Sequence, residues 1–180
     1  MMNFRRIALV SGLAILSAVA FAPKAGAAPA TQDVNFNGTV VATCLFSSTT
    51  SGALVNNNHN AWLEGSGGST VGSIGTAAST TVNCTSGGLL AVSQPVKVSA
   101  PATFSDTIRQ AVVYDGTNYM SSTGTAFDTG GWNKPTASLA IPVNTDRTLQ
   151  VAAVIGVNNI TGGVPTGTYS YKVTLTATPN

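Results

Sequence analysis

The sequence predicts an all-β protein of the sandwich class, and three observations support this prediction. Runs in which apolar and polar residues alternate recur along the chain, which is the pattern of strands with one buried face. No segment after residue 27 keeps a helical period over three turns. Glycine supplies 19 of the 180 residues, and turn-forming pairs separate the alternating runs. About seven short strands joined by frequent turns are typical of a β-sandwich.

The first 27 residues are expected to be a secretory signal peptide. Two basic residues precede an apolar run from Ile7 to Phe21, and Ala25-Gly26-Ala27 supplies a small-residue cleavage site. The apolar run is shorter than the ~20 residues that span a bilayer, and a retained anchor is the alternative. We therefore expect residues 28–180 to form one exported domain without a membrane span. Its location would be the periplasm, the cell surface or the extracellular space.

Removal of the leader changes the charge balance. The whole chain has a formal net charge of +2, but three of its eight basic residues, Arg5, Arg6 and Lys24, lie in the leader. The remaining chain then has five basic and six acidic residues, which gives a net charge of −1. Nucleic-acid binding through phosphate contacts needs more Lys and Arg than this, so we expect no nucleic-acid partner. Charged residues are 8% of the chain, which suits a β-rich extracellular protein or one whose surface is covered by neighbours.

Cys44 and Cys84 are the only two cysteines, 40 positions apart. In an oxidising compartment such a pair predicts one disulfide, with two free buried thiols as the alternative. Closing a loop of that length stabilises a fold by ~3–4 kcal/mol in the chain-entropy model. Each cysteine lies on the apolar side of an alternating run, so the two strands are expected to be neighbours.

The first expected strand runs from Val34 to Phe46, because its even positions are apolar apart from Gly38, include Cys44, and alternate with mostly polar residues. Gly38 interrupts this row and leaves a notch or marks a bulge. Residues 47–75 are rich in Ser, Gly and Asn, which predicts a long loop with one short strand near Ala53–Val55.

The remaining expected strands, in chain order, are 76–84, 89–99, 111–114, 118–120, 139–143, 149–157 and 169–177. Pro95 is expected to break or bend the run at 89–99. Asp115-Gly116 predicts a hairpin turn, because this pair favours the tight turns that join antiparallel strands. Pro142 predicts an edge strand or a bulge. Residues 149–157 are apolar at nearly every position, so this strand is expected to be covered on both faces.

No enzyme, metal site or cofactor is expected. Asp128-Thr129-Gly130 matches the Asp-Thr-Gly of aspartic proteases, but one copy would need a symmetric dimer, and a turn is the ordinary interpretation. His59 is the only histidine and lies among asparagines, where a solvated side chain is the ordinary state. A zinc site lacks ligands if the cysteines are bridged. Calcium held by Asp115, Asn118 or Asp128 is an alternative, although no known calcium motif is present.

The order of these features resembles the bacterial chaperone–usher pilin subunits, in particular their spore-coat-U-like or Csu-type branch. The resemblance rests on order and spacing over about half of the exported chain, because each piece alone is generic β-sequence. Its parts are the leader, Val34-x-Phe36-x-Gly38-x-Val40, Cys44, Cys84 at the end of a strong strand, Pro165-Thr166-Gly167-Thr168-Tyr169, and Val173-Thr174-Leu175-Thr176-Ala177.

The resemblance implies an immunoglobulin-like, pilin-type sandwich that lacks its last strand. That strand would come from a periplasmic chaperone, and later from the N-terminal extension of the next subunit, by β-strand addition. The partners would be this chaperone, an outer-membrane usher, and other pilin-like subunits or further copies of this chain. Residues carried over by position are Val34, Phe36, Gly38 and Val40 as donor or first strand, Tyr169, Tyr171, Val173 and Leu175 beside the acceptor groove, and Cys44–Cys84 as the family's disulfide.

The alternative is a stand-alone secreted binding module, adhesin- or lectin-like, that does not polymerise. It would use the long loops at residues 47–75 and 121–134. Trp62, Tyr119 and Trp132 could stack on sugars or could cap the ends of the sandwich.

Overall fold

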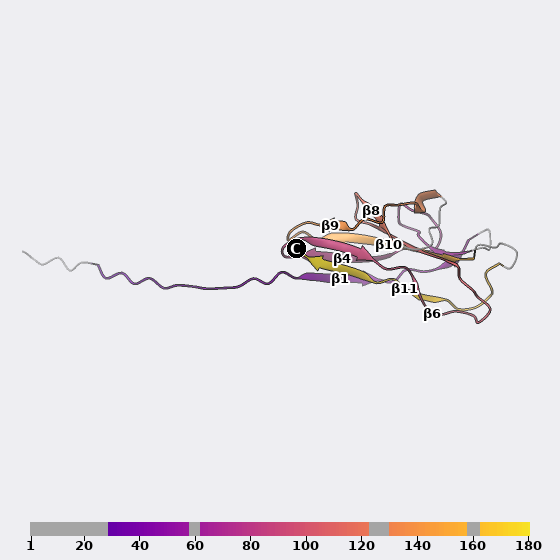
Figure 1. The fold of residues 1–180 in the computed structure, drawn as a ribbon, viewed down its shortest axis with the longest axis horizontal. Helices are drawn as coiled ribbons and strands as arrows, with labels where there is room; N and C mark the ends of the chain where they lie inside the picture. The colour runs from indigo at the N-terminus through magenta and orange to yellow at the C-terminus, as the bar shows by residue number, and fades with distance from the viewer. Residues whose placement is uncertain (1–28, 58–61, 123–129, 158–162) are drawn as a thin grey trace, which may run out of the picture. The chain divides into compact units, whose positions relative to one another are not determined.

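The computed structural model describes residues 29–57, 62–122, 130–157 and 163–180. The chain divides into two units, Met1–Gly38 and Thr39–Asn180, of which the second, here called the body, holds all the described strands. Figure 1 shows their arrangement within the body. The strands are β1 (Cys44–Thr50), β2 (Val55–Asn56), β3 (Trp62–Gly65), β4 (Ala78–Cys84), β5 (Gly88–Val92), β6 (Val96–Ser99), β7 (Ile108–Tyr114), β8 (Tyr119–Ser121), β9 (Leu139–Ile141), β10 (Arg147–Gly156), β11 (Ser170–Lys172) and β12 (Leu175–Pro179).

The first layer of the body is a seven-stranded antiparallel sheet built around β10. The first half of β10 pairs with β4 and its second half with β3, while β7 pairs along its other edge. β1 lies outside β4, and the β7–β8 hairpin forms the opposite side. The only helical segment among the described residues is the 3₁₀ turn Gly130–Trp132, and no helix in this part of the chain is long and apolar enough to cross a membrane.

The second layer consists of two small antiparallel sheets, β12-β5-β9 and β11-β6. One core joins it to the first layer, since buried residues from both pack together. These residues are Val82, Cys84, Leu90, Val113, Met120, Leu139, Ile141, Leu149 and Val151. The all-β sandwich that the sequence predicts is therefore confirmed.

β10 is covered on both faces, as its unbroken apolar sequence predicts. Leu149 and Val151 face the core between the layers. Ala152 and Val154 face a second buried cluster on the other side of the sheet, together with Trp132 and others. Burial on both faces explains why this strand shows no polar alternation.

Three local predictions are also confirmed. β5 ends at Val92 and β6 begins at Val96, so the run breaks around Pro95. β7 and β8 form the hairpin at Asp115-Gly116, where Gly116 has a φ of +94° that favours glycine. β9 pairs with β5 alone among the described strands, which places Pro142 next to an edge.

The prediction of a strand from Val34 is wrong, because the first strand of the structure begins at Cys44. Residues 34–43 alternate like a strand but have no strand partner among the described residues, and a lone strand cannot pair its backbone groups. The sequence also missed β3 (Trp62–Gly65), which lies inside the segment interpreted as a loop and pairs with β10. The short strand expected at Ala53–Val55 lies slightly later, at Val55–Asn56.

Candidate functional site

The described body has a groove of about 420 Å³ between β1 and the C-terminal strands β11 and β12. β1 and β12 lie on the same side of the sandwich and run in opposite directions (Figure 1). The groove is lined by Thr49, Thr50, Ser51, Gly52, Ala53, Leu54, Gly65, Thr76, Ala78, Ser79, Thr80, Val98, Val151, Ala153, Ser170, Tyr171, Lys172, Val173 and Leu175. Lys172 is the one charged residue in this set, so the groove is apolar and weakly polar along its length.

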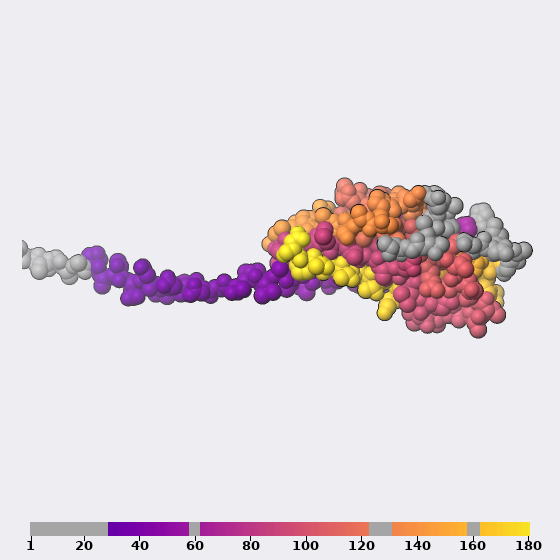
Figure 2. Space-filling view, viewed as in Figure 1, coloured from indigo at the N-terminus to yellow at the C-terminus, as the bar shows by residue number. Residues whose placement is uncertain are grey.

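The core is incompletely covered on the β12 side of the groove. Val173, Leu175 and Ala177 pack against the buried core but are only half-buried. Ala177 lies opposite Leu90 in the β12–β5 ladder, and Leu90 is fully buried. Paired residues share one face of a sheet, so Ala177 would be as buried as Leu90 if β12 had a neighbour on its other side. The greater exposure of Ala177 therefore indicates that this neighbour is missing. The C-terminal strand, yellow in Figure 2, accordingly lies at the surface of the body.

The core is also open on the β1 side of the sandwich, at Phe46, which lies before the β1 residues that line the groove. Phe46 pairs with Val82 and therefore faces the inside of the sandwich. Val82 is completely buried, but Phe46 is 40% exposed. An inward-facing aromatic ring that is this exposed indicates that a strand which would cover this part of the core is missing.

Three of the strands that border the groove have one edge without a ladder. Among the described residues, β1 pairs only with β4, β11 only with β6, and β12 only with β5. Free strand edges are templates for a further strand, and natural proteins normally blunt or cover them. Here such edges lie on both sides of one apolar groove.

The disulfide joins the start of β1 to the end of β4 at one end of the sandwich, beyond the residues that line the groove, and the predicted bridge is confirmed. Cys44 and Cys84 are bonded and are direct register partners in the β1–β4 ladder. Gly88 lets β5 pass next to them, because a Cβ at this position would lie 2.6 Å from the carbonyl oxygen of Thr178 and about 3 Å from both sulfurs. β1, β4, β5 and β12 thus converge at this end.

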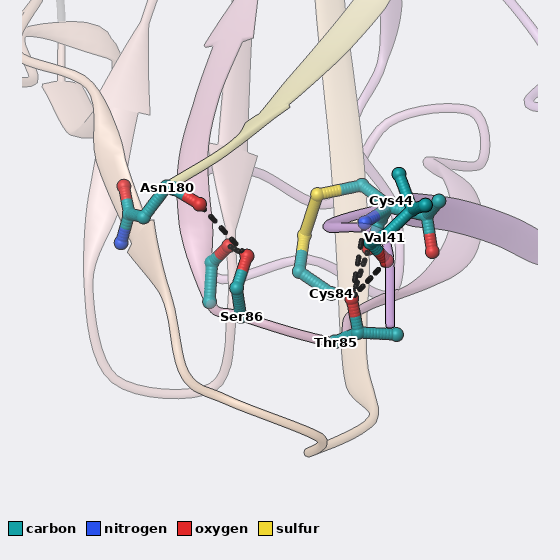
Figure 3. The surroundings of a disulfide bond; sticks show 8 residues. Val41, Cys44, Cys84, Thr85, Ser86 and Asn180 are labelled. Carbon is teal, nitrogen blue, oxygen red and sulfur yellow. Dashed lines mark hydrogen bonds between the residues drawn. A yellow bond between two sulfur atoms is a disulfide. The ribbon is translucent and has the colours of Figure 1, made fainter. Parts of the chain in front are cut away.

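Figure 3 shows a second clamp beside the disulfide, formed by Thr85. Its backbone amide donates to the carbonyl oxygen of Thr43 at 2.9 Å, and its Oγ1 accepts from the Thr43 amide at 3.0 Å. Ser86 donates its hydroxyl to the Asn180 carbonyl at 3.0 Å. These bonds fix the start of β1 and the end of β12 to the same turn.

Tyr171, which lines the groove, is bonded to a buried ionic cluster centred on Asp106. The Asp106 side chain is 3% exposed and accepts from Lys97 at 2.6 Å and from Arg109 at 2.7 Å. The Tyr171 hydroxyl donates to the same carboxylate at 2.9 Å. Sequence reasoning did not identify this cluster. In a chain with so few charges, the closeness of Asp106 and Arg109 in the sequence was the available signal.

The surroundings in this cluster shift the pKa values of Asp106 and Tyr171. Burial by itself raises the pKa of Asp106, but hydrogen bonds from Lys97, Tyr171, its own backbone and Arg109 outweigh it, so the pKa lies below the ordinary 3.8. Burial, followed by the hydrogen bond to Asp106 and its charge, raises the pKa of Tyr171. Asp106 is therefore a stable anion at neutral pH.

The predicted donor residues belong to the segment before β1 in the sequence and are not among the residues that line the groove. Val34, Phe36 and Val40 are 69%, 92% and 88% exposed, and a Cβ at Gly38 would contact nothing within 4 Å. These four residues therefore form an exposed, strandless segment that keeps the alternation of a strand. We call residues 29–43 the arm.

The predicted acceptor residues divide into two sets. Tyr171, Val173 and Leu175 line the groove. Tyr169 does not, because its hydroxyl donates to the Pro165 carbonyl and its ring packs edge-on against Phe104, with centroids 5.0 Å apart. The β1 wall at residues 49–54 was missed, because this Ser- and Gly-rich stretch was interpreted as a loop.

The structure describes only some of the candidate catalytic and metal-binding residues. Asp128 and His59 lie outside the described residues. Asp115 accepts from the amides of Thr117 and Asn118 at 2.9 and 2.6 Å, so its carboxylate shapes the hairpin turn. Within the described ranges, no group of three His, Cys, Asp or Glu side chains could hold a metal ion.

The aromatic residues proposed for sugar stacking have structural partners. Trp132 is 3% exposed and belongs to the second buried cluster, against which Trp62 and Tyr119 also pack. Tyr119 stacks on Tyr114 with centroids 4.6 Å apart, and Lys134 lies 4.2 Å from its ring centre. These rings cover the second cluster rather than line an open groove.

No family model, curated protein or solved structure matches this chain.

Proposed function

We propose that this protein is an exported, non-enzymatic structural subunit, pilin-like in its immunoglobulin-type sandwich, that assembles by β-strand addition at the cell surface. The observation that carries this proposal is the groove between β1 and β11–β12, where an apolar core is left half-covered between two free strand edges. A strand placed there would bond to the free edges and bury the exposed row of β12.

The arm has the sequence that such a strand requires. Its apolar residues Val34, Phe36 and Val40 alternate with Asn35, Asn37 and Thr39, so a strand would present one apolar face. This arrangement supports the arm of another copy, or of a related subunit, as the occupant. A periplasmic chaperone would fill the groove before assembly, and an outer-membrane usher would direct the exchange.

The arm can act as a donor because its residues belong to no strand of its own body, and only its last residues, up to Thr43, are bonded to Thr85. Its described residues before Cys44 belong to no strand, and Phe36 is almost fully exposed. A fully exposed Phe is costly in water, and burying such a side chain stabilises by about 1.5–3 kcal/mol. Assembly would supply that burial and would pair the edges of β1 and β12 at the same time.

The experiment uses a synthetic peptide of residues 29–43 and the chain from residue 39 onward as acceptor. We expect the peptide to bind and to raise the midpoint of thermal unfolding in a concentration-dependent manner. A Phe36→Asp peptide should bind about a hundredfold more weakly, because a charge replaces the apolar anchor. The matched control, Asn35→Asp, adds the same charge on the polar face and should bind like the original. Absence of binding, or equal binding of all three peptides, would refute the proposed function.

A further inference from the structure

Part of the groove wall is formed by a two-stranded ribbon of β6 and β11. Among the described residues, these strands pair only with each other, whereas β12 belongs to a three-stranded sheet with β5 and β9. The ribbon contributes Val98, Ser170, Tyr171 and Lys172 to the groove. Its position against the other layer therefore depends on side chains and not on a continuous ladder.

Asp106 supplies the connection between this ribbon and the large sheet. It lies just before β7 and is bonded to Lys97 of β6, Tyr171 of β11 and Arg109 of β7. The Lys97 ammonium also donates to the Phe104 carbonyl at 3.0 Å and lies 5.6 Å from the Phe104 ring centre. One buried carboxylate thus joins both strands of the ribbon to a strand of the opposite layer.

The contact at Tyr171 links this cluster directly to the groove. Tyr171 lines the groove, and its hydroxyl is held by Asp106. A displacement of the ribbon would move the free edge of β11 and change the separation that an incoming strand must bridge. Strand pairing needs neighbours about 4.8 Å apart, so the edge must be held within a narrow range.

We propose that Asp106 is a positioning residue for strand capture, which holds the β6–β11 ribbon so that the free edge of β11 stays in place to pair with an incoming strand. The effect on strand capture rests on the proposed function. That Asp106 holds the ribbon in place is a property of the isolated chain and does not. Asp106 acts through Tyr171 and Lys97, without touching the incoming strand.

The test compares the full chain with Asp106→Asn, Tyr171→Phe and the control Asp146→Asn. Asp146 accepts from Asn83 at 2.7 Å and is not among the residues that line the groove, so its variant removes a carboxylate of the same kind at a remote place. Two quantities are measured: the affinity for the 29–43 peptide, and the hydrogen-exchange rates of the amides of Ser170–Lys172 and of Leu175–Thr178. If Asp106→Asn does not fold, Tyr171→Phe replaces it in the comparison, because this change removes only one hydroxyl.

We expect Asp106→Asn to weaken peptide binding about tenfold, the usual effect of losing a charged hydrogen bond, and Tyr171→Phe to weaken it less. Exchange should accelerate in β11 but not in β12, and Asp146→Asn should change neither quantity. Equal acceleration in β11 and β12 would overturn the inference, because it indicates general destabilisation, and so would unchanged affinity and unchanged exchange. Failure of the unmodified chain to bind the peptide refutes the proposed function instead, and the exchange rates then still decide whether Asp106 holds the ribbon.

Discussion

At the scale of single residues, Asp106 is the most constrained charge that the structure describes. Its carboxylate is buried and satisfied by two cations and a tyrosine hydroxyl. Removing one partner of such a cluster is costly, because the remaining charges stay desolvated without compensation. The cluster should therefore be visible in the response of the fold to acid.

The pH dependence follows from the direction of the Asp106 shift. Its pKa is lower in the folded chain than its ordinary 3.8, so its stabilising contribution is fully present above that value and is lost as the pH falls through the folded pKa. We expect the urea midpoint of the unmodified chain to fall as the pH drops below 3.8. In Asp106→Asn the midpoint should start lower at pH 7 and fall less steeply. Equal acid slopes in the two proteins would contradict this assignment.

At the scale of elements, the groove is defined by strands whose inner residues are unequally buried. Leu90 on β5 is fully buried, whereas Leu175 on β12 is half-buried, although both pack in the same core. Truncation of a fully buried Leu to Ala costs about 2–5 kcal/mol, and a half-buried one costs less because water already reaches it.

This difference predicts how the two positions respond to an added strand. Leu90→Ala should destabilise the chain more than Leu175→Ala in urea unfolding without peptide. With the 29–43 peptide in excess, the cost of Leu175→Ala should rise toward that of Leu90→Ala, because the added strand covers Leu175. The prediction fails if the cost of Leu175→Ala is the same with and without peptide.

The same strands show what could be predicted from the sequence. Alternation and turn residues located β4, β7, β10 and the hairpin at Asp115-Gly116, since each of these strands buries a face inside its own chain. The same rule assigned Val34–Thr43 to the first strand, where the alternation has no described partner. Periodicity reports that a segment can form a strand but not which chain supplies its neighbour.

The groove itself could be predicted only in part. Val173 and Leu175 stand out as the apolar face of the last strand, but their half-burial depends on what lies next to β12. The opposite wall at residues 49–54 carries small polar residues without a period. Asp106 joins β6 and β7, which are near it in sequence, to Tyr171 of β11, which is 65 positions away, and no local pattern records that distant contact.

At the scale of the whole molecule, scarcity of charge is the dominant property. Charged residues make up 8% of the chain, the arm contains one, Asp33, and the groove lining contains one, Lys172. Association should therefore be driven by apolar burial and backbone pairing, which ionic strength affects little.

We expect the affinity for the 29–43 peptide to change less than about threefold between 50 and 500 mM NaCl, because only long-range charge attraction is screened over that range. Isothermal titration at the two salt concentrations measures this directly. A decrease of about tenfold or more would show that electrostatic attraction, and not the apolar face of the arm, governs binding.

The junction at Cys44 has a mechanical consequence. The arm enters the body at residues held by Thr85, immediately before a cysteine that is bonded to its own register partner on β4. In the proposed linear assembly, tension applied to the arm would pass into a covalent cross-link before it reached the ladder of β1. The hydrogen bonds between β1 and β4 cannot be opened one at a time from that end, so a pulled subunit must yield elsewhere first.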